Sequence, residues 1–337
     1  MHVAPEVKIA QIAPLAESAS PPACGGTERV VSYLAEELVR LGHDVTLFAG
    51  EPASPHASLA IERVRQRAHE FDVLHFHAFA RPLAAFRPLA RKGLVTVHGG
   101  LDDPARAAPG RELADLPLVS VSDHQRAAVP HSRWIGTVYH GLPEAVCPFN
   151  PAPPRGAARY LAFLGRVAPH TGLRPAVEIA RRAKTRLRIA AEVDAGADEQ
   201  YFRREIKPLL ADPLVQFVGE VDEAGKPAFL GNAAALLFPT DAPEPFGLAM
   251  IEAMSCGTPV IAFDRGSVRE IVEPGVTGAV VRGVDEAAEA AMSVDRLDRA
   301  RVRARFESRF SAARMTREYL ALYRRLAARP AAAVARL

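Results

Sequence analysis

Apolar residues follow two alternating patterns along the chain. Short runs rich in Val, Ile and Leu predict buried strands of a parallel sheet, and longer segments with an apolar residue every three or four positions predict helices that cover it. In the first half the predicted strands are 7–13, 43–49, 73–77, 94–97, 118–121 and 135–139. A helix over 28–41, ended by Gly42, separates the first two strands. This order predicts an α/β fold with a doubly wound sheet.

A proline-rich stretch over 140–159 separates this half from a second cycle of strands. Its composition is typical of a stiff connector. The second set of strands is predicted at 160–164, 187–191, 215–218, 234–238, 259–262 and 278–281. Because 337 residues exceed the size at which one core keeps growing, we expect two Rossmann-like domains, 1–150 and 151–310.

Composition narrows the class of protein. The chain is 49% hydrophobic and 24% charged, and no apolar run is long enough to cross a membrane. Its first residues lack the features of a secretory signal, so the expected location is cytoplasmic. Three widely spaced cysteines predict neither a disulfide framework nor a zinc site.

Charge is uneven although the net value is only +3. Residues 296–337 hold 12 Arg and 3 acidic residues. We expect a solvated helix face here, with weak peripheral membrane contact as the alternative and no nucleic acid partner. On the helix predicted over 312–328, an apolar stripe is expected to pack inward, formed by Met315, Tyr319, Leu322 and Tyr323.

Two short motifs follow predicted strands. Gly25 and Gly26 lie between the first strand and its helix, where small residues let backbone amides approach an anion or simply serve the turn. Arg166 follows the first strand of the second half. Its guanidinium either holds a diphosphate bidentately or lies on the surface.

Residues 239–262 form the most specific segment, predicted as strand, loop, helix, turn and strand. Glu244 precedes the helix and Glu252 lies about two turns along it. Carboxylates pair with vicinal hydroxyls, and the amides of Phe246, Gly247 and Leu248 at the helix start can accept a phosphate or a sugar oxygen. The alternative is that Glu244 complements the helix dipole and Glu252 is solvated.

Glu244 and Glu252 bound the motif Glu-Pro-Phe-Gly-Leu-Ala-Met-Ile-Glu, which resembles the donor-site signature of family 4 retaining glycosyltransferases of the GT-B fold. Similar landmarks lie at 25–28, 165–166, 217–221 and 317–325. The resemblance implies two Rossmann-like domains facing across a cleft, with the final helix, 311–329, packing back on the first domain. It also implies a nucleotide-diphosphate sugar donor, a hydroxyl acceptor and no cofactor.

The resemblance assigns roles on the donor side. It places Glu252 on the ribose hydroxyls and Glu244 on the donor sugar. The amides of Phe246, Gly247 and Leu248 would lie around the sugar and diphosphate.

Further roles are implied by the other landmarks. Arg166 would hold the diphosphate, Gly25 and Gly26 would approach it, and Val221 would contact the base. His98 matches the histidine at the acceptor side, so the implied catalytic residues are His98, Arg166 and Glu244.

One departure stands within the resemblance. The family reads Gly-Arg-x-x-x-Glu-Lys-Gly, whereas His170 and Thr171 replace the Glu and the Lys here. Arg174 is a candidate substitute for the missing lysine. Together with the short segment after Gly50, the loss keeps open a degenerate nucleotide-binding protein with weak or no transfer. Within the same fold, a nucleotide-sugar epimerase or hydrolase is a further alternative.

No metal is expected. Ten of eleven histidines precede residue 155, and His75 and His77 project to one face of a strand, but no carboxylate or cysteine completes a ligand set. There is also no Asp-x-Asp motif. The sequence therefore predicts metal-independent chemistry. For the retaining transfer that the resemblance implies, we expect a front-face mechanism, because no nucleophilic carboxylate is evident on the acceptor side.

Overall fold

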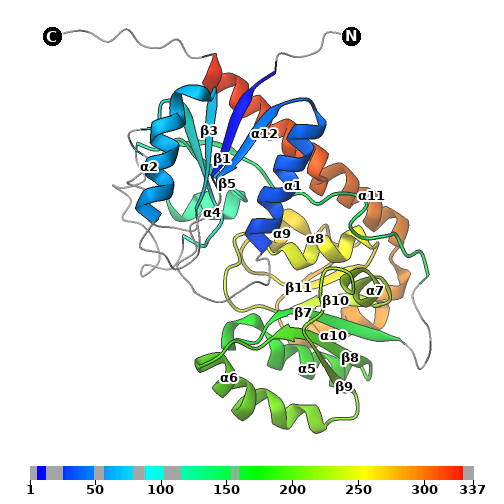
Figure 1. The fold of residues 1–337 in the computed structure, drawn as a ribbon. Helices are drawn as coiled ribbons and strands as arrows, with labels where there is room; N and C mark the ends of the chain where they lie inside the picture. Colours follow the sequence, from blue (N-terminus) through cyan, green and yellow to red (C-terminus); the bar gives the residue numbers. More distant parts are fainter. Residues whose placement is uncertain are drawn as a thin grey trace, which may run out of the picture. The chain divides into compact units, whose positions relative to one another are not determined.

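The computed structural model describes residues 6–12, 26–48, 57–78, 87, 89–101, 115–152, 156 and 159–328. Two compact units make up the chain (Figure 1). Unit 1 combines Met1–Gly141 with Ala312–Leu337, and unit 2 is Leu142–Ser311.

Unit 1 is built on a parallel sheet of six strands in the order β2-β1-β3-β4-β5-β6. The strands are β1 Lys8–Ile12, β2 Asp44–Phe48, β3 Val73–Ala78, β4 Gly93–Val97, β5 Leu118–Ser120 and β6 Trp134–Thr137. The helices described around it are α1 Gly26–Arg40, α2 Ala57–Arg67, η1 Ala68–Glu70, α4 Asp123–Ala128 and α12 Ala312–Ala327.

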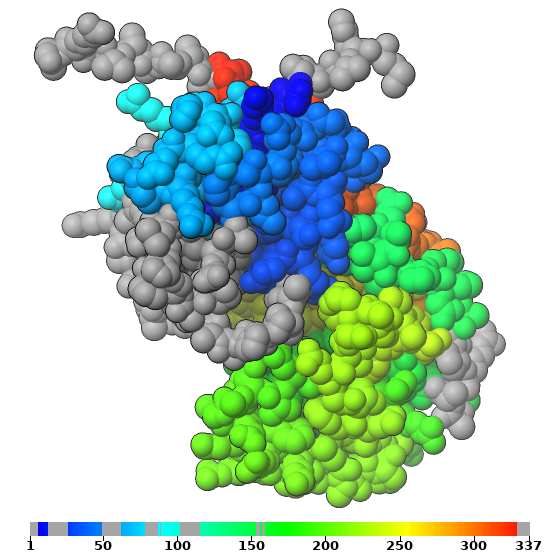
Figure 2. Space-filling view, in the orientation of Figure 1, coloured from blue at the N-terminus to red at the C-terminus, as the bar shows by residue number. Residues whose placement is uncertain are grey.

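Helices α1 and α12 pack side by side in unit 1. The buried face of α1 consists of Val30, Val31, Leu34 and Leu38. Helix α12 contacts both α1 and β3, and in Figure 2 it is largely hidden behind the blue surface to which α1 belongs. Its stripe of Met315, Tyr319, Leu322 and Tyr323 is buried, so this helix face packs inward.

Unit 2 is built on a second parallel sheet, in the order β12-β11-β10-β7-β8-β9. Its strands are β7 Tyr160–Arg166, β8 Arg186–Glu192, β9 Val215–Gly219, β10 Ala235–Phe238, β11 Val260–Phe263 and β12 Gly278–Val281. The helical segments are η4 Pro169–Thr171, α5 Leu173–Arg182, α6 Ala197–Tyr201, η5 Phe202–Ile206, η6 Lys207–Ala211, α7 Lys226–Gly231, α8 Leu248–Ser255, α9 Val268–Ile271, α10 Val284–Ser293, η7 Val294–Arg296 and α11 Arg299–Phe310.

The strand order of unit 2 fixes where a ligand can bind. The chain starts in the middle at β7, runs outward through β8 to β9, and then returns to β10 on the other side of β7. The order therefore reverses between β7 and β10. Open α/β sheets bind ligands beyond the carboxyl ends of their strands at such a switch point.

The α/β doubly wound prediction is confirmed, and each predicted strand lies within two residues of an observed one. The ends predicted at residues 13 and 49 fall outside the described residues. The apolar spacing over 295–306 also predicts one helix, but this stretch is divided between η7 and α11. Asp298 caps α11 by accepting a hydrogen bond from the Ala300 amide at 2.9 Å.

The first unit ends at Gly141, nine residues before the predicted boundary at residue 150. The reason is pairing of the connector with unit 2. The Leu142 amide donates to the Phe310 carbonyl at 2.9 Å. The Asn150 side chain donates from Nδ2 to the Gly231 carbonyl at 2.9 Å, and its backbone amide donates to the Cys256 carbonyl at 3.1 Å.

Two arginines of the Arg-rich stretch 296–337, Arg299 and Arg314, are buried and hydrogen-bond backbone carbonyls. Arg299 donates to the carbonyls of Asn150, Gly231 and Ala233 and to the Thr258 hydroxyl, at 2.7–3.0 Å. Burial lowers its pKa to about 10. These contacts correct the expectation that this arginine belongs to a solvated helix face.

Arg314 plays the same part in unit 1. It is 8% exposed and donates to the carbonyls of Tyr139 at 2.8 Å and His140 at 2.9 Å. It therefore fastens the first turn of α12 to the chain segment after β6.

Candidate functional site

Two loops at the switch point of unit 2 are bonded to each other. The loop after β7 offers the His170 carbonyl, which accepts from the Thr240 hydroxyl at 3.0 Å and the Asp241 amide at 3.2 Å on the loop after β10. Gly172 has a left-handed φ of +85°, and a β-carbon there would overlap the Pro239 carbonyl. The glycine thus permits the close approach of the two loops.

Arg166 is the last residue of β7, and its side chain is exposed. It forms an ion pair with Asp194, which lies just beyond β8. A guanidinium at the carboxyl edge of the sheet can also bind a diphosphate. Any such anion competes with Asp194 for it.

The backbone around Glu244 is held by hydrogen bonds from Ser267, in the turn that follows β11. Its carbonyl accepts from the Ser267 amide at 3.2 Å, and the Ser267 hydroxyl donates to the Phe246 carbonyl at 3.0 Å. Gly266, with φ +57°, has no room for a β-carbon against Glu244. Burial raises the pKa of the Glu244 carboxyl, and the nearby His170 opposes that rise.

Gly247 is the N-cap residue of helix α8 and adopts φ +84° and ψ +74°. Phe246 is buried and packs edge-on to Phe310, with ring centroids 6.1 Å apart. The amide of Met250 makes the first bond of the helix, to the Gly247 carbonyl at 3.1 Å. The amides of Gly247 and Leu248 therefore precede the helical hydrogen bonds, at the positive end of the helix dipole.

Glu252 is only 3% exposed. Its carboxylate pairs with the Lys226 ammonium at 3.2 Å, and Lys226 also pairs with Glu223 at 2.5 Å. Val221 lies nearby along the chain, with its Cγ1 2.9 Å from the position a β-carbon on Gly225 would take. The structure thus brings Glu252 to the segment that contains Val221.

Sequence reasoning missed Lys226. Glu252 was expected either on a ribose or in solvent, yet it is a buried member of an ion pair. The partner lies on α7, which follows a different strand, so no local spacing links the two residues.

The residues that replace the family lysine do not supply its charge. The Thr171 hydroxyl turns inward and donates to the Ala168 carbonyl at 2.8 Å. Arg174 is paired with Glu205, on η5. Thr171 therefore offers no cation to a diphosphate, and an anion would have to compete with Glu205 for Arg174.

In unit 1, Gly25 lies outside the described residues and Gly26 is the first residue of α1. His98 directly follows β4 and is buried. Its Nε2 lies 2.9 Å from His77 Nδ1, and its ring stacks on His140 with centroids 5.2 Å apart. Burial lowers the pKa of His98 to about 3, so the ring is neutral at physiological pH.

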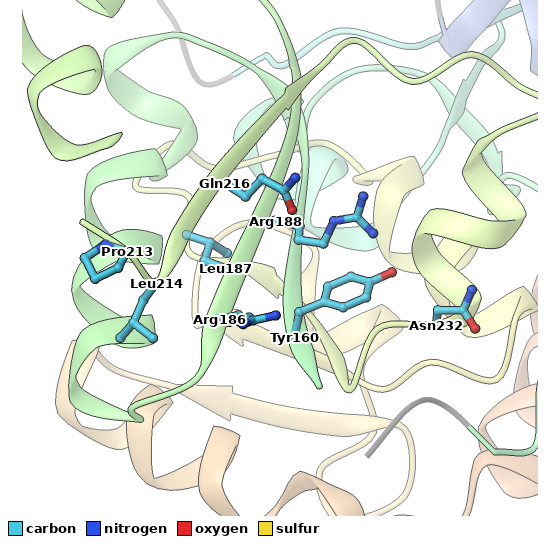
Figure 3. Close-up of a pocket in the computed structure, with 8 residues that line it drawn as sticks. All are labelled: Tyr160, Arg186, Leu187, Arg188, Pro213, Leu214, Gln216 and Asn232. Carbon is cyan, nitrogen blue, oxygen red and sulfur yellow. The ribbon is translucent and has the colours of Figure 1, made fainter. Parts of the chain in front are cut away.

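A hollow of about 510 Å³ opens near the amino ends of strands β7, β8 and β9 in unit 2, opposite the loops described above (Figure 3). It is lined by Tyr160, Arg186, Leu187, Arg188, Pro213, Leu214, Gln216 and Asn232. Tyr160 and Arg186 are the first residues of their strands, and the Arg188 guanidinium lies 4.9 Å from the centre of the Tyr160 ring. This hollow is therefore separate from the loops beyond the carboxyl ends.

Among the residues that the structure describes, no group of three or more His, Cys, Asp or Glu is arranged to hold a metal ion. Within the same ranges, every helix is too short or too polar to span a bilayer.

Comparison with known proteins agrees with this architecture. Residues 150–309 match the family model described as glycosyl transferases group 1. A D-inositol 3-phosphate glycosyltransferase of Thermobispora bispora is 30% identical over 68% of this chain, which spans 63% of that relative. A phosphatidyl-myo-inositol mannosyltransferase of Mycolicibacterium smegmatis is 28% identical over 85% of each chain.

Solved structures share the fold. AviGT4, a glycosyltransferase involved in avilamycin A biosynthesis, superposes with a TM-score of 0.75 at 24% identity, over 96% of this chain and 98% of that one. A sucrose-phosphate synthase from Thermosynechococcus elongatus gives 0.72 at 20% identity, over 95% and 99%. Anabaena Alr3699/HepE, solved with UDP and glucose, gives 0.67 at 18% identity, over 95% and 100%.

Two parallel six-stranded α/β units and these matches define the class of protein as a glycosyltransferase with the GT-B fold. More particularly, residues 150–309, which make up nearly all of unit 2, are matched by the glycosyl transferases group 1 family. The resemblance found in the sequence is confirmed at this level.

Proposed function

We propose that the protein is a retaining glycosyltransferase that moves a sugar from a nucleotide-diphosphate donor to a hydroxyl acceptor without a metal. One observation carries the proposal. The two loops at the switch point of unit 2 are bonded to each other; one directly follows Arg166, and the other contains Glu244 and leads into α8.

The residues of unit 2 have distinct roles in this proposal. Arg166 and the amides of Phe246, Gly247 and Leu248 bind the diphosphate and sugar oxygens, because cations and helix N-termini stabilise anions. Glu244 accepts a hydrogen bond from a sugar hydroxyl.

The nucleoside is bound farther along the edge of the sheet. Glu252, oriented by its ion pair with Lys226, accepts hydrogen bonds from the ribose. The segment at Val221 contacts the base. In unit 1, His98 contacts a sugar hydroxyl, and Gly25 and Gly26 approach the diphosphate.

The proposed reaction proceeds on one face of the sugar. The bond between the anomeric carbon and the diphosphate oxygen breaks, and the acceptor oxygen bonds to the anomeric carbon on that face. The acceptor proton passes to the departing diphosphate. Arg166 and the dipole of α8 stabilise the charge that develops on the diphosphate.

Calorimetry and product analysis test the proposal. Nucleoside diphosphates with each base are titrated first, and transfer is then measured from UDP-glucose, ADP-glucose and GDP-mannose to myo-inositol and to simple glycosides. We expect binding of one nucleotide, an anomeric configuration unchanged in the product, and activity that survives chelation by EDTA. An inverted product, or a requirement for added metal, would contradict the mechanism.

A second candidate function is nucleotide binding with weak or no transfer. The inward-turned Thr171 and the paired Arg174 favour it, since a cation is missing beside the leaving diphosphate. Thr171→Lys should raise diphosphate affinity about 2- to 5-fold, as expected for a partly exposed ion pair. Thr171→Ser is the matched control, because it retains the hydroxyl that bonds Ala168.

Transfer and hydrolysis distinguish the remaining alternatives. A binding protein leaves both at background although the nucleotide binds. A hydrolase or an epimerase instead converts the nucleotide sugar when no acceptor is present.

The partners proposed are the nucleotide sugar, a hydroxyl acceptor and, weakly, a membrane surface. Arg317, Arg324 and Arg325 are exposed on α12 and could contact anionic lipid. Sedimentation with anionic vesicles at low and high salt tests that contact, since electrostatic attraction weakens with ionic strength.

A further inference from the structure

A buried chain of hydrogen bonds crosses the sheet of unit 1 and ends at His98. From α12, the Tyr323 hydroxyl lies 3.0 Å from Gln11 Nε2. Gln11 Oε1 lies 2.7 Å from His77 Nε2, and His77 Nδ1 lies 2.9 Å from His98 Nε2. Tyr323 and the two side chains that link it to His98 are at most 3% exposed.

A branch of the same network leaves Tyr323 in the other direction. The Tyr323 hydroxyl lies 2.7 Å from His75 Nδ1, and His75 Nε2 lies 2.7 Å from the Thr96 hydroxyl. Thr96 in turn bonds Tyr319 at 3.0 Å. This branch leads away from His98 and so provides an internal control.

The amide of Gln11 determines which nitrogens carry protons. Its Oε1 can only accept, so His77 Nε2 carries a proton and donates. Burial holds the pKa of His77 well below its usual value, so the ring is neutral and Nδ1 is an acceptor. His98 Nε2 must then donate to His77.

His98 is neutral as well, so its other ring nitrogen, Nδ1, is unprotonated and can only accept a hydrogen bond. This atom is buried and has no hydrogen-bond partner among the residues that the structure describes. The ring cannot easily turn away, because it stacks on His140 at an interplanar angle of 14°. The His140 carbonyl is held in turn by Arg314.

We propose that Gln11 is a positioning residue that, through His77, keeps His98 in its Nε2–H tautomer and so presents His98 Nδ1 as the acceptor of a hydrogen bond from a sugar hydroxyl. The tautomer part stands on the network alone. The identity of the ligand as a sugar rests on the proposed function. A ligand group that only accepts hydrogen bonds would be disfavoured at this atom.

Two-bond proton–nitrogen NMR of protein with ¹⁵N-labelled histidine tests the tautomer, because protonated and unprotonated ring nitrogens resonate far apart. The His98 signals are assigned by their loss in His98→Gln. We expect Nε2 protonated and Nδ1 unprotonated in the unmodified protein. A protonated His98 Nδ1 would overturn the proposal.

Variants test the part played by Gln11. Gln11→Met preserves approximate volume but removes both hydrogen-bonding groups, so the two His98 nitrogens should move toward an averaged tautomer. Tyr319→Phe, on the branch that leads away, should leave them unchanged. If Gln11→Met does not fold, Tyr323→Phe removes the hydroxyl that orients the Gln11 amide and should also shift the tautomer. His98 signals that stay at their original positions in the folded variant would refute the role of Gln11.

Ligand titrations test separately whether His98 Nδ1 accepts a hydrogen bond from a bound hydroxyl. UDP-glucose, ADP-glucose and GDP-mannose are each compared with their nucleoside diphosphates, and each diphosphate is then combined with myo-inositol. A His98 Nδ1 shift caused by the nucleotide sugar assigns the hydroxyl to the donor, and one that requires myo-inositol assigns it to the acceptor. If calorimetry shows that the nucleotide sugar binds but no titration shifts His98 Nδ1, this nitrogen does not accept a hydrogen bond from the ligand. If no nucleotide binds at all, the proposed function is contradicted and the tautomer result still stands.

Discussion

The backbone carbonyl of Pro239 occupies the space that a β-carbon on Gly172 would need. This contact joins the loop after β7 to the loop after β10, at the switch point of unit 2. The glycine that ends the Arg166 motif therefore sets how closely the two loops can approach.

Gly172→Ala should lower both stability and nucleotide affinity. An alanine at φ +85° is strained, and its β-carbon also collides with Pro239. Left-handed strain costs about 1–2 kcal/mol and overpacking about 1–3 kcal/mol more. Urea unfolding and calorimetry measure the two effects.

Gly196→Ala is the matched control for that prediction. Gly196 has φ +90° but no atom within 4 Å of the added β-carbon. It should show the strain alone and retain nucleotide affinity. Equal losses in the two variants would mean that the contact with Pro239 has no energetic consequence.

Glu244→Gln should stabilise the protein at alkaline pH and weaken binding of the nucleotide sugar. Burial raises the pKa of Glu244 in the folded state, so the folded chain holds the proton more tightly than the unfolded chain. Stability contributed by the protonated form is lost as the pH rises above the ordinary value of 4.5, and the glutamine variant escapes that loss.

Melting temperatures at pH 4.5 and pH 8 check this expectation. A difference of 1 kcal/mol corresponds to about 2–4 °C in a unit of this size. Glu220→Gln, on an exposed residue, is the control and should change neither value. If Glu244→Gln melted at a lower temperature than the unmodified protein at pH 8, the predicted stabilisation would be contradicted.

Unit 1 should lose stability on acidification. Burial lowers the pKa of His75, His77, His98 and His140 below the ordinary value of 6.5, to about 3 for His98. The unfolded chain therefore takes up protons first as the pH falls below 6.5. Each histidine can remove up to about 1.4 kcal/mol per pH unit until its folded pKa is reached.

The single tryptophan, Trp134, lies in β6, so its fluorescence reports unfolding of unit 1. His98→Gln should make the acid dependence shallower, and His131→Gln, on an exposed histidine, should not. A flat pH profile between 6.5 and 4 in the unmodified protein would show that the network is not kept neutral.

Arg299→Lys should destabilise unit 2 by about 2–4 kcal/mol. Lysine cannot reproduce the planar fork that reaches several carbonyls at once. A buried cation left with too few partners is also costly. Circular dichroism during urea unfolding measures the loss, and Arg301→Lys, on the exposed face of the same helix, should cost less than about 0.5 kcal/mol.

The sequence predicts the strands well because each carries a strong local signal. Leu161 and Leu187 lie in short apolar runs, and both are fully buried in neighbouring strands. The positions of Arg166 and Glu244 near strand ends also follow from local pattern. The strand order then brings their loops to one edge of the sheet.

Long-range polar pairs are not predictable in this way. Gln11 and Tyr323 are 312 residues apart, and Lys226 and Glu252 lie on different helices. Each residue taken alone has the pattern of an ordinary polar or charged side chain. Only the packing of α12 against β3, or of α7 near α8, reveals the partner.

Helix α12 also determines the order in which the protein can be completed during synthesis. Unit 2 has all of its residues once Ser311 has been made, whereas unit 1 still lacks Tyr319 and Tyr323. In strands β1 and β3, Gln11 and His75 therefore lack their tyrosine partner until α12 leaves the ribosome. The part of unit 1 that packs against α12 is therefore completed only after unit 2 has all of its residues, which differs from the usual order in which domains fold from the N-terminus.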